Sequence, residues 1–175
     1  KGTVNPKKAE VTDPKAMTQH IKKVAEFLGA DVVGIAAIHP SMLFSGARSP
    51  DEGMGYDGGA GGHLSPEELA RKYPFAIILP VAWDYEMGQA HRHRIGDNAY
   101  HFSQQKQYAT YANVAAYIRE LGYSAIQGRL HAIPASLAAG IGELGRNGML
   151  ITEKFGARVH MGAPILTDLP LVPGK

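Results

Sequence analysis

Two short apolar runs, the first preceded by a helical pattern, constrain the fold of this chain most strongly. Residues 31–38 and residues 75–82 are rich in aliphatic side chains, as expected of buried strands. A helix pattern ahead of a buried strand indicates strands covered by helices, so we predict an α/β fold. Pro80 indicates an edge, a bulge or the end of the second strand.

The starts and ends of the helices are visible in the sequence. Asp13 and Pro14 suit the N-cap and first position of a helix, and Gly29 suits its end. The run Ser65-Pro66-Glu67-Glu68 starts a second, short helix that ends near Lys72. Further elements are predicted as follows: a long helix over residues 103–121, a small helix at 134–139, strands at 124–127, 149–152 and 158–166, and a polar, irregular segment over 83–101.

Composition favours one globular domain over residues 1–175, because 45% of the residues are hydrophobic, 19% are charged and no linker stands out. Residues 1–12 are predicted to form an extended arm, and the glycine-rich residues 51–62 a surface loop. A net charge of +2 without a long basic run argues against nucleic acid as a partner. No apolar stretch of about 18 residues is present, so a soluble protein is expected, with its localisation and any upstream signal left open.

The chain contains no cysteine. Disulfides, thiolate zinc sites, cysteine nucleophiles and cysteine-ligated iron–sulfur clusters are therefore excluded within this sequence. His91, His93 and His101 could in principle bind a metal, but Arg92 and Arg94 would repel a cation. We therefore predict a solvated loop and no metal site.

The segment 132–152 is the strongest candidate for a binding site. Its glycines allow the backbone to turn sharply and to approach a ligand closely, and Arg146 and Asn147 add hydrogen-bond donors. Residues 140–145 also match the G-x-G-x-x-G string of dinucleotide sites, but no strand leads directly into the match and no clear helix follows it. A dinucleotide site is therefore disfavoured, and spacing alone does not identify the ligand.

Residues 140–159, followed by Leu166-Thr-Asp-Leu-Pro-Leu171, resemble the signature of the corrinoid reductive dehalogenases. Epoxyqueuosine reductase carries a looser form of the same signature. Residues 17–31, 81–87 and 116–123 resemble further parts of the family in the same order, so that the resemblance covers most of residues 13–171.

This resemblance implies a nitroreductase-like α/β sandwich that binds cobalamin in the base-off form, buried and without a protein ligand to cobalt. In the family, an iron–sulfur segment follows the stretch that resembles 166–171 and delivers electrons. Here the chain ends four residues after Leu171 without any cysteine, so we expect no iron–sulfur cluster in this chain. Either the chain is a fragment or a natural truncation, or its electrons come from an external donor. The cofactor-binding residues that the resemblance implies are Ile133, Pro134, Ala135, Gly140, Gly142, Glu143, Leu144, Gly145, Arg146, Asn147, Gly148 and Arg158.

The resemblance also implies catalytic positions. A family tyrosine ahead of the long helix is proposed to protonate the substrate carbon, and alignment on Leu121-Gly-Tyr123 makes Tyr108 the nearest candidate. His160 stands where the family usually has an arginine that lowers the pKa of this tyrosine. Since histidine gains its charge only near pH 6.5, we expect proton delivery to improve as the pH falls toward about that value. Alternatively, His131 and His160 are proton donors themselves, or simply hydrogen-bonded histidines on strands.

Two functions from different classes remain open at this point. The first is reductive cleavage of a carbon–halogen bond in a small organohalide at cobalt(I), if electrons are supplied. The alternative is a non-catalytic corrinoid carrier or chaperone, which the missing cysteines favour if the chain is complete; a cysteine-rich continuation after Lys175 would favour the first. A flavin-binding nitroreductase-like protein is a third, weaker option, and the sequence leaves the substrate, the lower base of the corrinoid and the oligomeric state undetermined.

Overall fold

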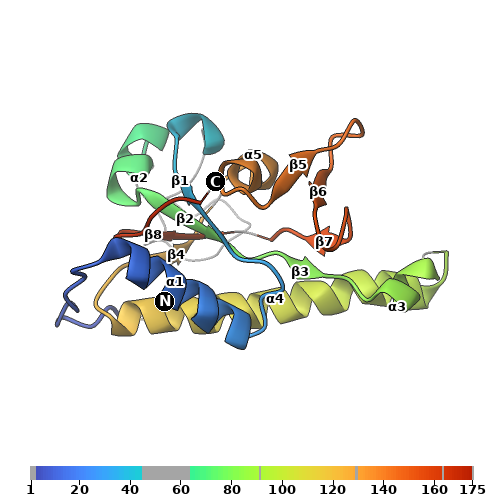
Figure 1. Ribbon diagram of the computed structural model, residues 1–175, viewed down its shortest axis with the longest axis horizontal. Helices are drawn as coiled ribbons and strands as arrows, with labels where there is room; N and C mark the ends of the chain where they lie inside the picture. The colour runs from blue at the N-terminus through green and yellow to red at the C-terminus, as the bar shows by residue number, and fades with distance from the viewer. Residues whose placement is uncertain (1–2, 45–63, 91, 129, 163, 175) are drawn as a thin grey trace.

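The computed structural model describes residues 3–44, 64–90, 92–128, 130–162 and 164–174, and the glycine-rich segment 51–62 lies outside them (Figure 1). A four-stranded antiparallel sheet forms the centre, with the strand order β1-β2-β8-β4. Its strands are β1 (Gly34–Ala37), β2 (Phe75–Ile78), β4 (Ala125–Gln127) and β8 (Ile165–Thr167). Helices cover both faces, and the predicted α/β layering is confirmed.

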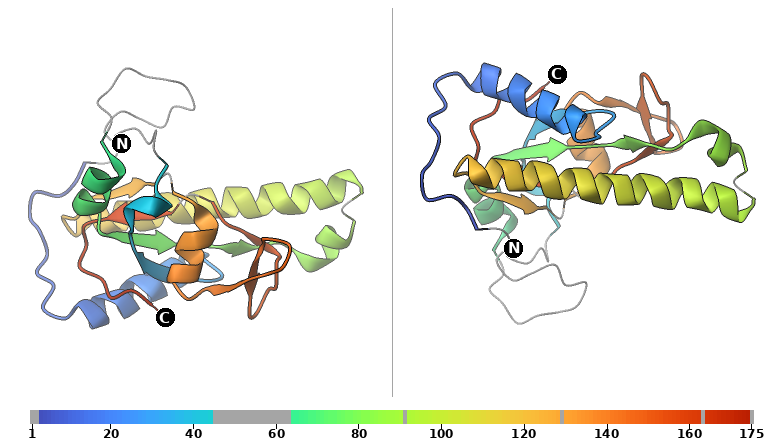
Figure 2. Two further views of the ribbon diagram at one scale, coloured as in Figure 1. Left: turned by 90° about the horizontal axis from the view of Figure 1, so that it is seen from above. Right: turned by 90° about the horizontal axis from the view of Figure 1, so that it is seen from below.

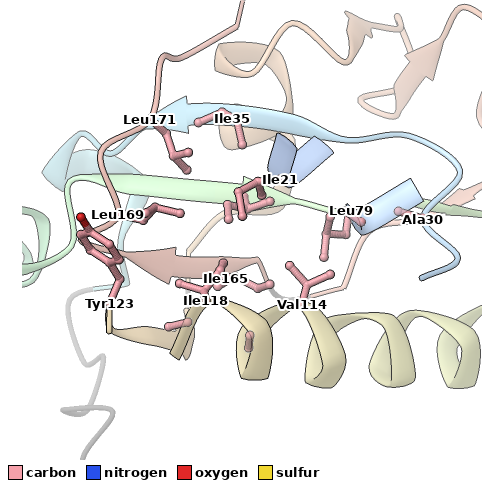
Figure 3. Packing of buried hydrophobic residues seen from close by; sticks show 14 residues of the cluster. Ile21, Ala30, Ile35, Leu79, Val114, Ile118, Tyr123, Ile165, Leu169 and Leu171 are labelled. Carbon is pink, nitrogen blue, oxygen red and sulfur yellow. The ribbon is translucent and has the colours of Figure 1, made fainter. Parts of the chain in front are cut away.

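One face of the sheet packs against α1 (Pro14–Phe27) and α4 (Arg94–Glu120). Ile35, Ile77 and Ile165 lie in register on neighbouring strands, and all three are fully buried. Figure 3 shows side chains from both helices and from the sheet meeting in this core; Ile21 comes from α1, and Val114 and Ile118 come from α4. Asp13 caps α1 as predicted, because its carboxylate accepts hydrogen bonds from two N–H groups of the first turn.

The other face of the sheet packs against α2 (Pro66–Lys72) and α5 (Ala132–Ala138). Ser65 and Glu68 form the capping box of α2, which confirms the predicted helix start. A short 3-10 helix, η1 (Pro40–Met42), follows β1. Because both faces of the sheet are covered, its strands are continuous apolar runs rather than alternating ones.

The prediction of an irregular segment over residues 83–101 is wrong. This segment contains α3 (Tyr85–Gln89) and the first part of α4, which begins at Arg94 rather than near Ser103. Gly96 and Ala99 are buried in that part of α4, and α4 packs against the neighbouring β3 and β7. Tertiary packing therefore stabilises a helix that the polar sequence of this stretch does not indicate.

The second apolar run ends as a strand at Ile78 and resumes after Pro80 as β3 (Val81–Ala82). Strand β3 pairs with β7 (Val159–His160) in a separate two-stranded ribbon. A second ribbon is the hairpin of β5 (Gly142–Leu144) and β6 (Leu150–Thr152). The two ribbons, α3 and the N-terminal half of α4 extend beyond the central sheet at one end of the molecule (Figures 1 and 2).

Residues 3–12 form neither a helix nor a strand, and they lie against the C-terminal end of α4. Asn5 N–H donates to the Arg119 carbonyl at 2.9 Å, and Ala9 N–H donates to the Leu121 carbonyl at 2.8 Å. Gly122 ends the helix with a φ of 83°, and a Cβ there would lie 2.5 Å from the Lys8 Cα. Only glycine permits this close approach of the arm. None of the helices in the described ranges is both long and apolar enough to cross a membrane.

Asp31 connects the β3 ribbon to α4. Its carboxylate accepts the Ala82 N–H at 2.9 Å and also pairs with the Lys106 ammonium at 3.0 Å. The ion pair is partly exposed, whereas the hydrogen bond satisfies a partly buried backbone group. The backbone contact should therefore carry most of the stability that Asp31 provides.

We predict that Asp31→Ala lowers the free energy of unfolding by about 1–3 kcal/mol, because Ala82 N–H loses its acceptor. Lys106→Met removes only the ion pair and should cost less than about 1 kcal/mol. Urea unfolding of both variants measures the two losses. Equal losses would contradict the dominant role of the backbone contact.

Candidate functional site

The segment 132–152, expected to bind a ligand, consists of α5 followed by a β-hairpin. Strands β5 and β6 pair with Gly142 opposite Thr152 and Leu144 opposite Leu150. The turn is closed by hydrogen bonds from Gly145 N–H to the Met149 carbonyl and from Gly148 N–H to the Gly145 carbonyl. Since β5 leads into this turn and not into a helix, the geometry of a dinucleotide fingerprint is absent from residues 140–145, all of which are described.

The hairpin itself explains two of its glycines. A Cβ at Gly142 would lie 2.3 Å from the Ile151 carbonyl oxygen of the paired strand, and a Cβ at Gly145 would lie 2.7 Å from Asn147 Oδ1. These two glycines permit close packing within the hairpin, whatever binds to it. Close approach of a ligand to their backbone stays a prediction.

The hairpin exposes an unusual amount of apolar surface. Leu144, Met149 and Ile151 are 58%, 43% and 38% exposed, respectively. Glu143, Arg146, Asn147 and Gly148 are exposed beside them, as is Gly140, which precedes β5. Apolar side chains flanked by amide and charged groups suit a large, flat ligand with a polar edge.

The remaining cofactor residues implied by the resemblance fall in two places. On α5, Ile133 is half-buried, Pro134 is exposed and Ala135 is fully buried in the core. Arg158 lies instead beside the start of α3: its Nη1 donates to the Trp83 carbonyl at 2.7 Å, and its guanidinium lies 4.9 Å from the centre of the Tyr85 ring. Ala135 and Arg158 thus have evident structural roles.

His160 lies in an aromatic cluster on β7. Its side chain is 9% exposed, and the Tyr100 ring packs edge-on against it with 5.0 Å between ring centres. Tyr100 also packs edge-on against Trp83 at 5.6 Å. Burial lowers the pKa of His160 below its usual value, so this histidine is neutral at pH 7 and gains a proton only at a lower pH than the expected 6.5.

The tyrosine that contacts His160 is therefore Tyr100, not the expected Tyr108. Tyr108 lies eight residues further along α4, about 12 Å along the helix axis. Both tyrosines are exposed, Tyr100 by 37% and Tyr108 by 44%, so they differ in position and not in exposure. Tyr111 lies deeper in the structure, where burial raises its pKa to about 12 against the opposing effect of Arg119, so it stays protonated. Sequence analysis missed Tyr100 because the segment that contains it was expected to be irregular.

A pocket of about 260 Å³ lies beside this cluster. Its walls are Trp83, Gly96, Asp97, Tyr100 and His101, so that Tyr100 contacts both the pocket and His160. The indole Nε1 of Trp83 is buried and has no hydrogen-bond partner among the described residues. Tyr100 thus lies between a small, open pocket with aromatic walls and a buried imidazole.

The other histidines do not gather into a site in the described part of the chain. His93 precedes α4 as its N-cap, and His131 precedes α5, with its ring centre 4.1 Å from that of Phe44. His91 lies outside the described residues. Among the residues that are described, no three acidic or histidine side chains are grouped to hold a metal ion.

Comparison with known proteins identifies relatives along nearly the whole chain. It is 31% identical over 183 aligned residues to tetrachloroethene reductive dehalogenase of Dehalobacter restrictus, with 89% of this chain and 33% of that protein covered. It is 26% identical to tetrachloroethene reductive dehalogenase of Sulfurospirillum multivorans, over 95% of this chain and 37% of that protein. The chain thus spans about a third of the length of these curated relatives, and no protein-family model matches it.

Solved structures agree on the fold. A reductive dehalogenase whose structure was described with a mechanism for B12-dependent dehalogenation matches with a TM-score of 0.74 and 23% identity, covering 99% of this chain and 24% of its own. A catabolic reductive dehalogenase in complex with 3-bromo-4-hydroxybenzoic acid matches with the same TM-score, identity and coverage. Epoxyqueuosine reductase from Streptococcus thermophilus is more distant, with a TM-score of 0.55 and 15% identity over 90% of this chain and 47% of its own. These matches confirm the expected fold of the B12-binding domain.

The lowered pKa of His160 predicts a pH-dependent loss of stability. Above about pH 6.5 the imidazole is neutral in both the folded and the unfolded chain. Below that pH the unfolded chain takes up a proton that the folded chain resists, so folding becomes less favourable as the pH falls. His160→Gln removes this effect. On going from pH 7.5 to pH 5, the free energy of unfolding should therefore fall more for the parent than for the variant.

Urea unfolding of both proteins at the two pH values measures this difference. Titration of the His160 ring protons by NMR checks the cause, with an expected midpoint below 6.5. A midpoint at or above 6.5 would show that the histidine is not held neutral.

Proposed function

We propose that this chain, which belongs to the reductive dehalogenase family, is one corrinoid-binding domain that holds cobalamin against its β5–β6 hairpin. The observation that carries the proposal is the exposed apolar surface of this hairpin, in the segment where the resemblance places the cofactor. Leu144, Met149 and Ile151 offer apolar contact to the face of a corrin ring. Glu143, Arg146 and Asn147 offer hydrogen bonds to its amide edge.

The position of the hairpin supports the same proposal. It projects from the same end of the molecule as the β3–β7 ribbon and the N-terminal half of α4 (Figures 1 and 2). A cofactor on the hairpin therefore lies at the same end of the molecule as the Tyr100–His160 cluster. We expect cobalamin to be bound base-off, without a protein ligand to cobalt.

The chemistry that we propose is the reductive removal of halide from a small organohalide. The reaction R–X + 2e⁻ + H⁺ → R–H + X⁻ needs two electrons and one proton, and a bound corrinoid supplies the redox centre at which the carbon–halogen bond is reduced. The chain supplies binding, an open pocket with aromatic walls and a proton held on the Tyr100 hydroxyl group. Its electrons come from an external donor, because the chain has no cysteine that could ligate an iron–sulfur cluster.

Tyr100 fits the role of proton donor better than Tyr108. It lines the pocket and contacts His160, whereas Tyr108 lies about 12 Å away along α4. A neutral His160 can orient the Tyr100 ring, but it does not stabilise a tyrosinate as a permanently charged guanidinium does. Proton delivery should thus be slow at neutral pH.

The second candidate function is a corrinoid carrier or chaperone without catalysis. No cysteine of this chain can ligate an iron–sulfur cluster, and a domain that only holds cobalamin needs none. Both functions require cobalamin binding, and they differ in whether the loaded chain turns over an organohalide.

We predict that Leu144→Ser weakens cobalamin binding about tenfold or more, which corresponds to about 1.4 kcal/mol, because it removes apolar contact with the corrin. Phe27→Ser is the matched control, since Phe27 is 89% exposed on α1 and should not affect binding. Gel filtration and absorbance titration measure the affinity. The bound cob(II)alamin should show the spectrum of cobinamide, which lacks the lower base; a base-on spectrum, or free elution of cobalamin at micromolar concentrations, would contradict the proposal.

For the cobalamin-loaded chain, we predict that Tyr100→Phe lowers the dehalogenation rate about 100-fold or more, the usual contribution of a general acid. Tyr108→Phe should change the rate only slightly. The assay uses reduced titanium as the electron source, with tetrachloroethene and a bromophenol as substrates. A larger effect of Tyr108→Phe would restore Tyr108 as the donor, and no turnover by the loaded parent chain would favour the carrier function.

A further inference from the structure

The pocket beside Tyr100 is lined by aromatic side chains and one carboxylate. Three of its five lining residues are aromatic, Trp83, Tyr100 and His101, and the others are Gly96 and Asp97. No lysine or arginine is among these five residues. Aromatic walls favour flat or polarisable ligands, and the carboxylate gives the pocket a single negative group.

The Asp97 carboxylate is not paired in the described part of the structure, where no salt bridge to it is found. The nearby guanidinium of Arg158 is occupied by the Trp83 carbonyl and the Tyr85 ring. Asp97 lies in the first turn of α4, where its charge offsets the partial positive charge of the helix N-terminus. Arg94 begins α4 three residues before Asp97, but neither Arg94 nor Arg158 is among the residues that line the pocket. The lining itself therefore offers no cation to an anionic ligand.

Resting on the function proposed above, we propose that Asp97 determines specificity, so that the pocket accepts uncharged halogenated compounds and rejects anionic ones such as halobenzoates. Asp97 is exposed at the open side of this pocket, so repulsion between like charges carries the argument. An anion bound there would lie beside an unpaired carboxylate, and no lysine or arginine in the lining would compensate. An uncharged organohalide loses little hydration and gains contact with the rings. Asp97 thus acts by repulsion and not by a contact that the reaction requires.

The chain provides its own reporter for this proposal. Trp83 is its single tryptophan, and it lines the pocket. A bromine atom bound beside an indole quenches its fluorescence through the heavy-atom effect. Quenching of Trp83 therefore measures occupancy of the pocket without cobalamin and without turnover.

The test compares 3-bromobenzamide with 3-bromobenzoate at pH 8, because the two have the same ring and halogen and differ in charge. The parent chain should bind the amide at least about tenfold more tightly than the benzoate. Asp97→Asn keeps the size of the side chain and should reduce this ratio to near one. Glu120→Gln removes the same charge from the other end of α4 and should leave the ratio unchanged.

Equal affinities for the two probes in the parent chain, or a ratio that Asp97→Asn does not change, would overturn the proposal. So would the absence of saturable quenching by either probe, since the pocket would then bind no organohalide. Circular dichroism checks that both variants are folded. Failure of cobalamin binding is seen separately, by absorbance, so the two proposals can fail independently.

Discussion

Helix α4 is the element on which the rest of the structure depends. It has 27 residues and is therefore about 40 Å long, which is much longer than the three- and four-residue strands that it covers. Its C-terminal half is fixed in the core by Val114 and Ile118. Its N-terminal half continues beyond the sheet and carries Tyr100 and other residues of the pocket. Because one continuous helix spans both parts, its packing in the core also fixes where the site lies.

The site is otherwise held by very short pieces of secondary structure. The β3–β7 ribbon has two residues on each strand, and Trp83 and Arg158 extend it through two hydrogen bonds of 3.0 and 2.7 Å. Asp31 fastens the same ribbon to α4. Arg158, which the resemblance implies as a cofactor residue, thus also maintains the position of His160. Substitution of such a residue would affect the site through its scaffold as well as through any ligand.

Much of the fold follows from local signals in the sequence. Asp13 and Ser65 indicate helix starts because their side chains accept hydrogen bonds from free backbone N–H groups. Pro80 interrupts a strand because it has no backbone N–H to donate. The start of α4 could not be predicted in this way, since α4 packs there against β3 and β7, and its Gly96 and Ala99 are buried. One strand of the hairpin, β6, was predicted at residues 149–152, but its partner β5 was visible only as part of a glycine-rich segment, because strand pairing depends on residues on both sides of the turn.

The pairing of Tyr100 with His160 was missed for a related reason. The family resemblance is clear at Leu121-Gly-Tyr123, about 20 residues from the tyrosine, and the sequence between them does not determine which tyrosine corresponds to the family's.

Backbone hydrogen exchange with and without cobalamin tests the proposed position of the cofactor most directly. Cobalamin should protect the β5–β6 hairpin and the first half of α4, while α1 remains unchanged. Protection that is absent from the hairpin, or that falls on α1, would contradict the proposed position of the cofactor.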